Sequence, residues 1–86
     1  MIRYIPKMDS ALWSRKCQET FASIDDMKHF IADQRTRFCH FIGKPDSSYD
    51  QHDVELRFLC KRDPVLCWKN CFTVIVGGTV VGYCGE

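Results

Sequence analysis

The chain has 86 residues, 45% of them hydrophobic and 27% charged, so it suits a single domain spanning 1–86 and excludes most enzymes with a large cofactor cradle. Its 12 Lys and Arg side chains nearly balance its 11 Asp and Glu side chains. This balance argues against a dedicated duplex-DNA binder, because each phosphate contact needs a cation.

The N-terminal part of the chain predicts two strands. Residues 2–6 suit a short strand, which its final proline ends or keeps at a sheet edge. In residues 10–21, the apolar side chains Trp13, Cys17 and Phe21 recur every four positions. That spacing fits one face of a strand as well as one face of a helix, and we favour the strand.

A long helix is predicted over 24–42. Ser23 can cap its free amides, and Asp25 and Asp26 favour the positive end of the helix dipole. Gly43 is a natural stop. The apolar face is expected to contain Ile24, Met27, Ile31, Phe38 and Phe41 or Ile42, and the solvated face Asp26, His29, Asp33 and Arg37.

The C-terminal half predicts three strands. Apolar and polar side chains alternate from Val54 to Cys60, which indicates a half-buried strand with both of these residues on one face. Residues 72–76 and 79–83 flank Gly77-Gly78, a pair that suits a two-residue hairpin turn. We therefore expect an α+β fold, with a small antiparallel sheet of about four to five strands and the helix packed on one face.

An unbulged two-residue turn would set the register of this hairpin. Val76 then opposes Thr79, and counting outward places Cys71 opposite Cys84 at a non-hydrogen-bonded pair. We expect these two thiols to be neighbours, with β-carbons about 4.5–5.5 Å apart. In a reducing compartment they would stay reduced, and in oxidising buffer they would form a strained disulfide.

The six cysteines also suggest a zinc site. Cys60, Cys67, Cys71 and Cys84 supply four soft ligands, the number that a structural zinc ion prefers. The spacing contains no C-x-x-C pair, so cysteines that only fill space are the favoured alternative. A catalytic cysteine is disfavoured, because nothing in the sequence resembles a nucleophile elbow or an oxyanion loop.

Two sets of charged residues are candidate binding surfaces. The stretch between Pro45 and Leu56 holds acidic side chains and no Lys or Arg, which suits a basic partner surface. Its candidate contacts are Asp46, Asp50, Asp53 and Glu55, with Trp68 as an apolar anchor. The candidate contacts of a nucleic-acid binder are Arg35, Arg37, Lys44, Arg57, Lys61 and Arg62. Plain solvated surface is the alternative for both sets.

Three stretches of the chain resemble a known group of proteins. They are Arg3-Tyr4-Ile5-Pro6, the segment from Phe30-Ile31-Ala32-Asp33 through Phe38-Cys39, and Val80-Val81-Gly82-Tyr83-Cys84-Gly85-Glu86. Together they resemble small uncharacterised proteins carried on mobile elements of gut Firmicutes. The resemblance covers most of the chain and includes no catalytic motif. It implies a genetic context in which small cargo proteins are often regulators or inhibitors of host defence, including anti-CRISPR proteins.

These observations predict a small, non-catalytic, cytoplasmic module without a cofactor. Its expected partner is a protein such as a CRISPR effector or another host nuclease. The N-terminus has no apolar run of signal-peptide length, and the longest apolar stretch, 74–84, is too short to span a bilayer as a helix. The alternatives are a small nucleic-acid-binding regulator and a zinc-stabilised interaction domain. A homodimer is a further option, because one helix leaves part of a single-layer sheet uncovered.

Overall fold

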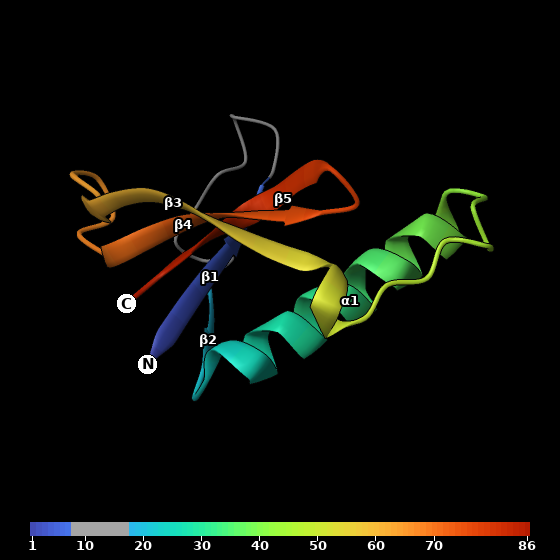
Figure 1. The fold of residues 1–86 in the computed structure, drawn as a ribbon, viewed down its shortest axis with the longest axis horizontal. Helices are drawn as coiled ribbons and strands as arrows, with labels where there is room; N and C mark the ends of the chain where they lie inside the picture. The colour runs from blue at the N-terminus through green and yellow to red at the C-terminus, as the bar shows by residue number, and fades with distance from the viewer. Residues whose placement is uncertain (8–17) are drawn as a thin grey trace.

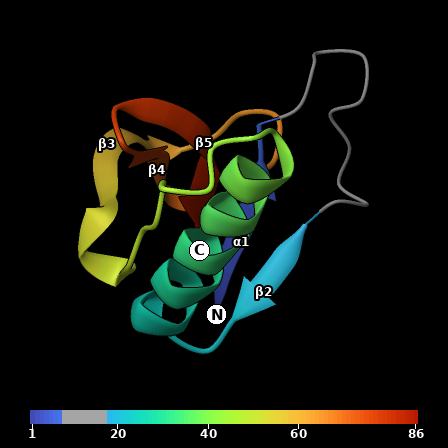
Figure 2. The same ribbon diagram turned by 90° about the vertical axis from the view of Figure 1, so that its right-hand side faces the viewer.

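The computed structural model describes residues 1–7 and 18–86. The described elements are β1 (Ile2–Pro6), β2 (Glu19–Phe21), α1 (Ile24–Phe41), the 3₁₀ turn η3 (Gln51–Asp53), β3 (Val54–Arg62), β4 (Lys69–Val76) and β5 (Thr79–Gly85). The strands form an antiparallel sheet in the order β2-β1-β5-β4-β3 (Figure 1). Figure 2 shows β2 and β3 on opposite sides of α1, which packs on one face of the sheet. The expected α+β fold is confirmed.

The first predicted strand is confirmed as β1. Its last residue, Pro6, pairs with Gly82 of β5, while the described pairs with β2 run only from Ile2 to Tyr4. Pro6 therefore ends the strand, as its missing N–H favours. Of the second predicted strand, residues 10–17 lie outside the described residues, and its end forms β2.

The helix begins where the sequence predicts. The Ser23 side chain accepts a hydrogen bond from the Asp26 amide at 3.1 Å, and acidic residues occupy the first turn. The helix ends at Phe41, one residue before the predicted end. The four residues of the predicted solvated face are all exposed. Within the described part of the chain, α1 lacks the run of apolar residues that crossing a membrane requires.

The predicted apolar face of the helix is only partly buried. Met27 and Ile31 are buried against the sheet, but Phe41 is 88% exposed. Ile24, Phe38 and Ile42 are also exposed. The prediction is wrong for these four. For Phe38, Phe41 and Ile42 the reason is that α1 extends past the end of the sheet in Figure 1, so its C-terminal turns have no strand beneath them. Ile24 is the first residue of α1.

The hairpin between β4 and β5 is confirmed, but its register is not. Gly77 and Gly78 have φ values of 58° and 78°, as a type I′ turn requires, and Val76 opposes Thr79. The register then shifts between Val74 and Ile75, so that Phe72, not Cys71, opposes Cys84. The predicted neighbouring pair Cys71–Cys84 is therefore wrong.

The extra residue in β5 is Val81, and contacts with β1 explain it. The Val81 carbonyl accepts hydrogen bonds from the Tyr4 hydroxyl at 3.1 Å and from the Lys7 amide at 2.8 Å. A β-carbon on Gly82 would lie 2.4 Å from the Ile5 carbonyl oxygen and 2.6 Å from the Tyr4 ring. The bulge thus depends on β1, a tertiary neighbour that the hairpin sequence does not contain.

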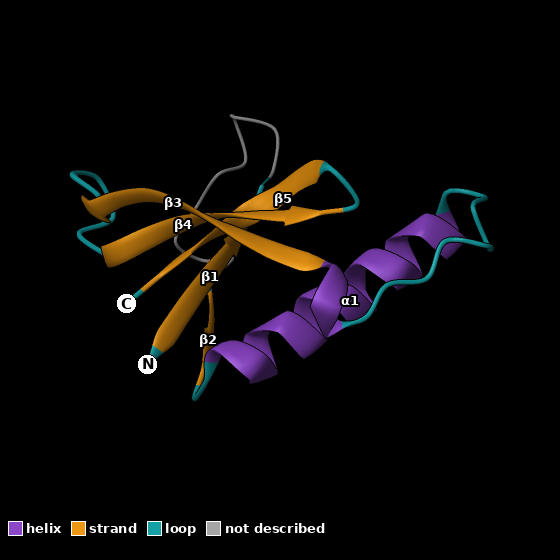
Figure 3. Ribbon diagram, viewed as in Figure 1, coloured by secondary structure: helices purple, strands orange, loops and turns teal. Residues whose placement is uncertain are grey.

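Figure 3 distinguishes the strands of the sheet from the helix and the loops by colour. Hydrophobic clusters lie on both faces of this sheet. The helix-side cluster consists of Tyr4, Met27, Ile31, Ala32, Val54, Val74, Val76 and Cys84. The far-side cluster consists of Ile5, Trp68 and Cys71, against which Cys60 and Leu66 pack. The connection from β3 to β4 supplies part of this second cluster, so α1 is not the only cover of the sheet.

A second irregularity in β3 moves Cys60 away from its predicted face. Phe58 opposes Phe72, and Cys60 opposes Cys71, so Leu59 is an extra residue in the ladder. Such a bulge reverses the alternation of side chains beyond it. Cys60 therefore lies in the far-side cluster, whereas Val54 belongs to the helix-side cluster.

Candidate protein-binding surface

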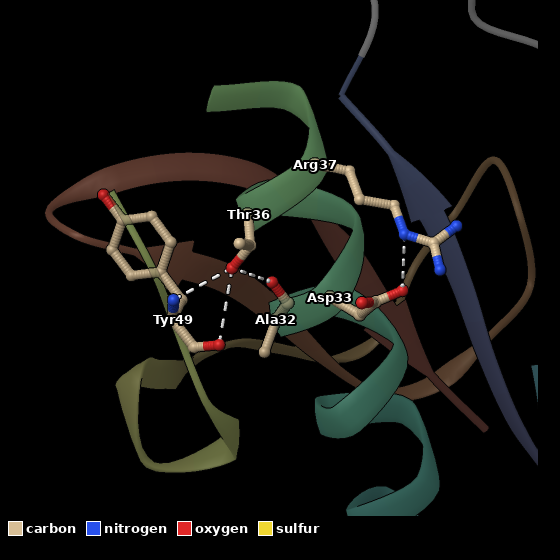
Figure 4. A network of polar contacts seen from close by, with 5 residues as sticks. All are labelled: Ala32, Asp33, Thr36, Arg37 and Tyr49. Carbon is tan, nitrogen blue, oxygen red and sulfur yellow. Dashed lines mark hydrogen bonds and ion pairs between the residues drawn. The ribbon is translucent and has the colours of Figure 1, made fainter. Parts of the chain in front are cut away.

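The predicted acidic segment is tied to the middle of α1 by one threonine. The Thr36 hydroxyl accepts a hydrogen bond from the Tyr49 amide at 2.9 Å and donates one to the Ala32 carbonyl at 2.9 Å (Figure 4). The Tyr49 ring packs against the helix-side cluster, and its hydroxyl lies close to Gly77 in the hairpin turn. These contacts fix the segment at Tyr49, immediately before Asp50.

The following turn is held by the acidic side chains themselves. Asp50 caps η3 by accepting a hydrogen bond from the His52 amide at 2.8 Å. Asp53 accepts one in return from the Asp50 amide at 2.9 Å, which completes a capping box. Both carboxylates therefore keep a defined direction while remaining exposed to solvent.

We call the four predicted acidic contacts the acidic ledge, namely Asp46, Asp50, Asp53 and Glu55. All four are exposed. Glu55 forms an ion pair with Arg57 at 3.3 Å, the one side-chain partner found for it among the described residues. The predicted acidic set is thus exposed along one continuous segment, of which the η3 turn contacts α1.

A groove of about 320 Å³ runs between this segment and α1. Its lining includes Asp50 from the ledge together with His29 and Asp33 from the helix. Asp33 forms an exposed ion pair with Arg37 at 3.1 Å (Figure 4). Sequence analysis placed His29 and Asp33 on the solvated face and did not connect them with the ledge, because only the folded loop brings the two segments together.

Trp68 does not offer the surface expected of an anchor. It is 2% exposed and belongs to the far-side cluster. Its carbonyl accepts hydrogen bonds from the Asp63 amide at 2.9 Å and from the Cys71 thiol at 3.4 Å. Trp68 closes the far side of the sheet in this structure, so we do not include it in the binding surface proposed below.

The predicted basic set is divided between the two ends of the molecule. In Figure 1, the C-terminal end of α1 and the C-terminal end of β3 point in opposite directions. Arg37 and Arg57 are engaged in ion pairs, and the Arg35 guanidinium lies 4.9 Å from the Phe38 ring centroid. Lys44, Lys61 and Arg62 are exposed. The six cations therefore do not form one nucleic-acid-binding patch.

The four predicted zinc ligands do not converge on one point, although Cys60 and Cys71 oppose each other in the sheet. Cys84 lies in the helix-side cluster and Cys71 in the far-side cluster, while Cys67 is exposed. Burial, first of all, raises the pKa of Cys84 to about 11 and also raises the pKa of Cys71, which disfavours the thiolate that binds metal. Over residues 1–7 and 18–86, no three His, Cys, Asp or Glu side chains are placed to hold a metal ion.

Comparisons with known proteins add no relative. No protein-family model matches the chain, and neither a curated protein nor a solved structure matches it significantly.

Proposed function

We propose that this protein is a non-catalytic binding module that places the acidic ledge against a basic surface of a partner protein. The observation that carries the proposal is that hydrogen bonds from Thr36 and within the Asp50–Asp53 capping box hold the middle of the ledge in place. Charges that are already oriented lose little conformational freedom on binding. Complementary charge then guides the encounter and selects the partner.

The groove beside the ledge supports this proposal. A lysine or arginine side chain of the partner would enter the groove that Asp33 and Asp50 both line. Arginine suits this position, because its planar guanidinium accommodates two carboxylates at once.

A more specific proposal concerns the class of protein that the acidic ledge binds. Basic surfaces that accept an acidic ledge occur where proteins hold nucleic acid, because each phosphate contact needs a cation. Together with the resemblance to mobile-element proteins, this supports an inhibitor of a host defence nuclease, such as a CRISPR effector. The ledge would block the nucleic-acid channel by occupying its cations.

A charge-removal variant tests the binding surface. Asp46→Asn/Asp50→Asn/Asp53→Asn removes three charges, while asparagine oxygens still accept the capping hydrogen bonds. The control Glu19→Gln/Asp25→Asn/Glu86→Gln removes three exposed charges elsewhere. We expect the ledge variant to retain about tenfold less partner in a tagged pull-down from nuclease-treated host lysate, and the control to match the wild type. Equal recovery by both variants would contradict the proposal.

Two further readouts separate the classes of partner. If recovery disappears when the lysate is treated with nuclease, the protein is a nucleic-acid binder instead. If a nuclease is recovered, its cleavage rate is measured with the purified wild type and with the ledge variant. Inhibition by the wild type alone is the outcome that an inhibitor requires.

A further inference from the structure

Two cysteines that the sequence does not pair are direct neighbours in the structure. Cys60 of β3 opposes Cys71 of β4, immediately after the Leu59 bulge. Both thiols belong to the far-side packing, where Cys60 contacts the buried cluster that contains Cys71. Burial, first of all, raises the pKa of the Cys71 thiol, and the neighbouring Cys60 raises it further.

The geometry of this pair matches that of a disulfide. Residues directly opposite in an antiparallel ladder have α-carbons about 4.5–5.5 Å apart. Disulfide-bonded cysteines have α-carbons about 4.4–6.8 Å apart. The register therefore brings the α-carbons of Cys60 and Cys71 into the range that a disulfide spans.

None of the other described cysteines lies opposite another cysteine in the sheet. Cys39 lies on α1, and Cys84 faces the helix-side cluster. Cys67 is exposed in the connection between β3 and β4, where its φ of 59° turns the chain. The strand register thus selects one pair among the five described thiols.

Cys60 is the more accessible thiol of the pair, since Cys71 is 3% exposed. Cys60 is half-buried. A mostly apolar hollow of about 220 Å³ opens beside Cys71 and is also lined by Leu59, Trp68 and Tyr83. A small thiol reagent can therefore approach the pair without unfolding the sheet.

We propose that Cys60 and Cys71 form a reversible cross-strand disulfide by exchange with a low-molecular-weight disulfide such as oxidised glutathione. The Cys60 thiolate attacks oxidised glutathione, which forms a mixed disulfide and releases one glutathione thiolate. The Cys71 thiolate then attacks the Cys60 sulfur, which forms the protein disulfide and releases the second glutathione. Overall, the two protein thiols lose two electrons and two protons. Oxidised glutathione gains these electrons and protons and becomes two molecules of reduced glutathione.

This bond would lock the connection between the edge strand β3 and its neighbour. It closes the loop that contains Asp63, Leu66 and Trp68, and it holds the Leu59 bulge in place. The exposed side chains of Phe58 and Leu59, at 58% and 54%, lie next to the bond. Oxidation therefore changes the mobility of an exposed part of the sheet edge, at a distance from the acidic ledge.

The test is disulfide mapping of the full-length protein in glutathione buffers of increasing oxidised fraction, with free thiols trapped by N-ethylmaleimide. Trypsin cuts between Cys60 and Cys71, and chymotrypsin cuts after Phe72 and Tyr83, so the Cys71 and Cys84 peptides are resolved. We expect the Cys60–Cys71 linkage to predominate in the wild type and in Cys84→Ala. It should be absent from Cys60→Ser, in which Cys71 stays alkylated.

The same oxidation in concentrated urea supplies the reference for an unfolded chain. The proposal requires that the folded protein favour Cys60–Cys71 at least about tenfold over the pairing found in urea. It is overturned if the folded and unfolded pairing patterns agree, if linkages through Cys67 predominate, or if both thiols remain alkylated in fully oxidised glutathione. Because the wild type and Cys84→Ala decide the outcome, poor folding of a Cys60 or Cys71 variant does not obscure it.

Discussion

At the scale of single residues, Tyr4 shows how one side chain joins two strands to the helix side of the core. Its ring covers Gly82, and its hydroxyl donates to the Val81 carbonyl at 3.1 Å. Burial is the main cause that raises the pKa of Tyr4 from 10.0 to about 12. Cys84 opposes Tyr4 in the ladder, and burial raises the pKa of Cys84 from 9.0 to about 11.

These two groups predict how stability changes in alkaline solution. The folded state keeps both protons to higher pH than the unfolded state does, so the free energy of unfolding falls as pH rises. The stabilisation is complete below about pH 9 and is lost between about pH 9 and 12. Urea unfolding at a series of pH values measures this loss.

Variants separate the two contributions. Tyr4→Phe should lower the stability by about 1 kcal/mol at pH 8, because the hydrogen bond to Val81 is lost, and should flatten the fall above pH 10. Cys84→Ala should flatten the fall between about pH 9 and 11 instead. A wild-type midpoint that stays constant from pH 8 to 11 would refute this account.

At the scale of elements, the link between α1 and the acidic segment depends on Thr36. In Thr36→Val, the Tyr49 amide loses its acceptor at a partly buried site, while the volume of the side chain is nearly unchanged. We expect the free energy of unfolding to fall by about 1–2 kcal/mol, measured by urea denaturation. Thr20→Val, on the exposed face of β2, should change it by less than about 0.5 kcal/mol.

Thr36→Ser completes this comparison, because serine keeps the hydroxyl. It should remain closer to the wild type than the valine variant does. If Thr36→Val, Thr36→Ser and Thr20→Val all have the same stability, the Thr36 hydrogen bond does not hold the acidic segment in place. The proposed function would then lose its structural basis.

Some features of the helix and strands are predictable from the sequence and others are not. The start of α1 and the Gly77-Gly78 turn follow from local chemistry, and the structure confirms both. The bulges at Leu59 and Val81 do not. The bulge at Val81 depends on β1, which is distant in the sequence, and the bulge at Leu59 becomes visible only in the pairing of β3 with β4. One extra residue in a ladder reverses every side chain beyond it, so these two bulges replace the predicted thiol pair by another.

The candidate binding surface is also only partly predictable from the sequence. The ledge carboxylates follow from the composition of one segment, since a stretch without Lys or Arg is visible in the sequence. Asp33 and His29 join the groove only after the loop has folded against α1. The burial of Trp68 is equally a tertiary result, because the connection from β3 turns back under the far side of the sheet.

At the scale of the whole molecule, the sheet order predicts a gradient of local stability. The central strand β5 pairs with β1 on one side and β4 on the other, and its Cys84 is buried in the helix-side cluster. Within the described residues, the nine-residue strand β3 pairs only with β4. Backbone amides on its free edge therefore have water as their partner.

Hydrogen exchange followed by NMR measures this gradient directly. We expect the amides of β5 to exchange slowest, close to the rate that global unfolding sets. Alternate amides of β3, those that point away from β4, should exchange about 100-fold faster or more. Protection of these outward amides that increases with protein concentration would instead show a second copy of the chain on this edge. Because β3 has acidic residues near its start and Lys61 and Arg62 at its end, an antiparallel second copy would bring opposite charges together.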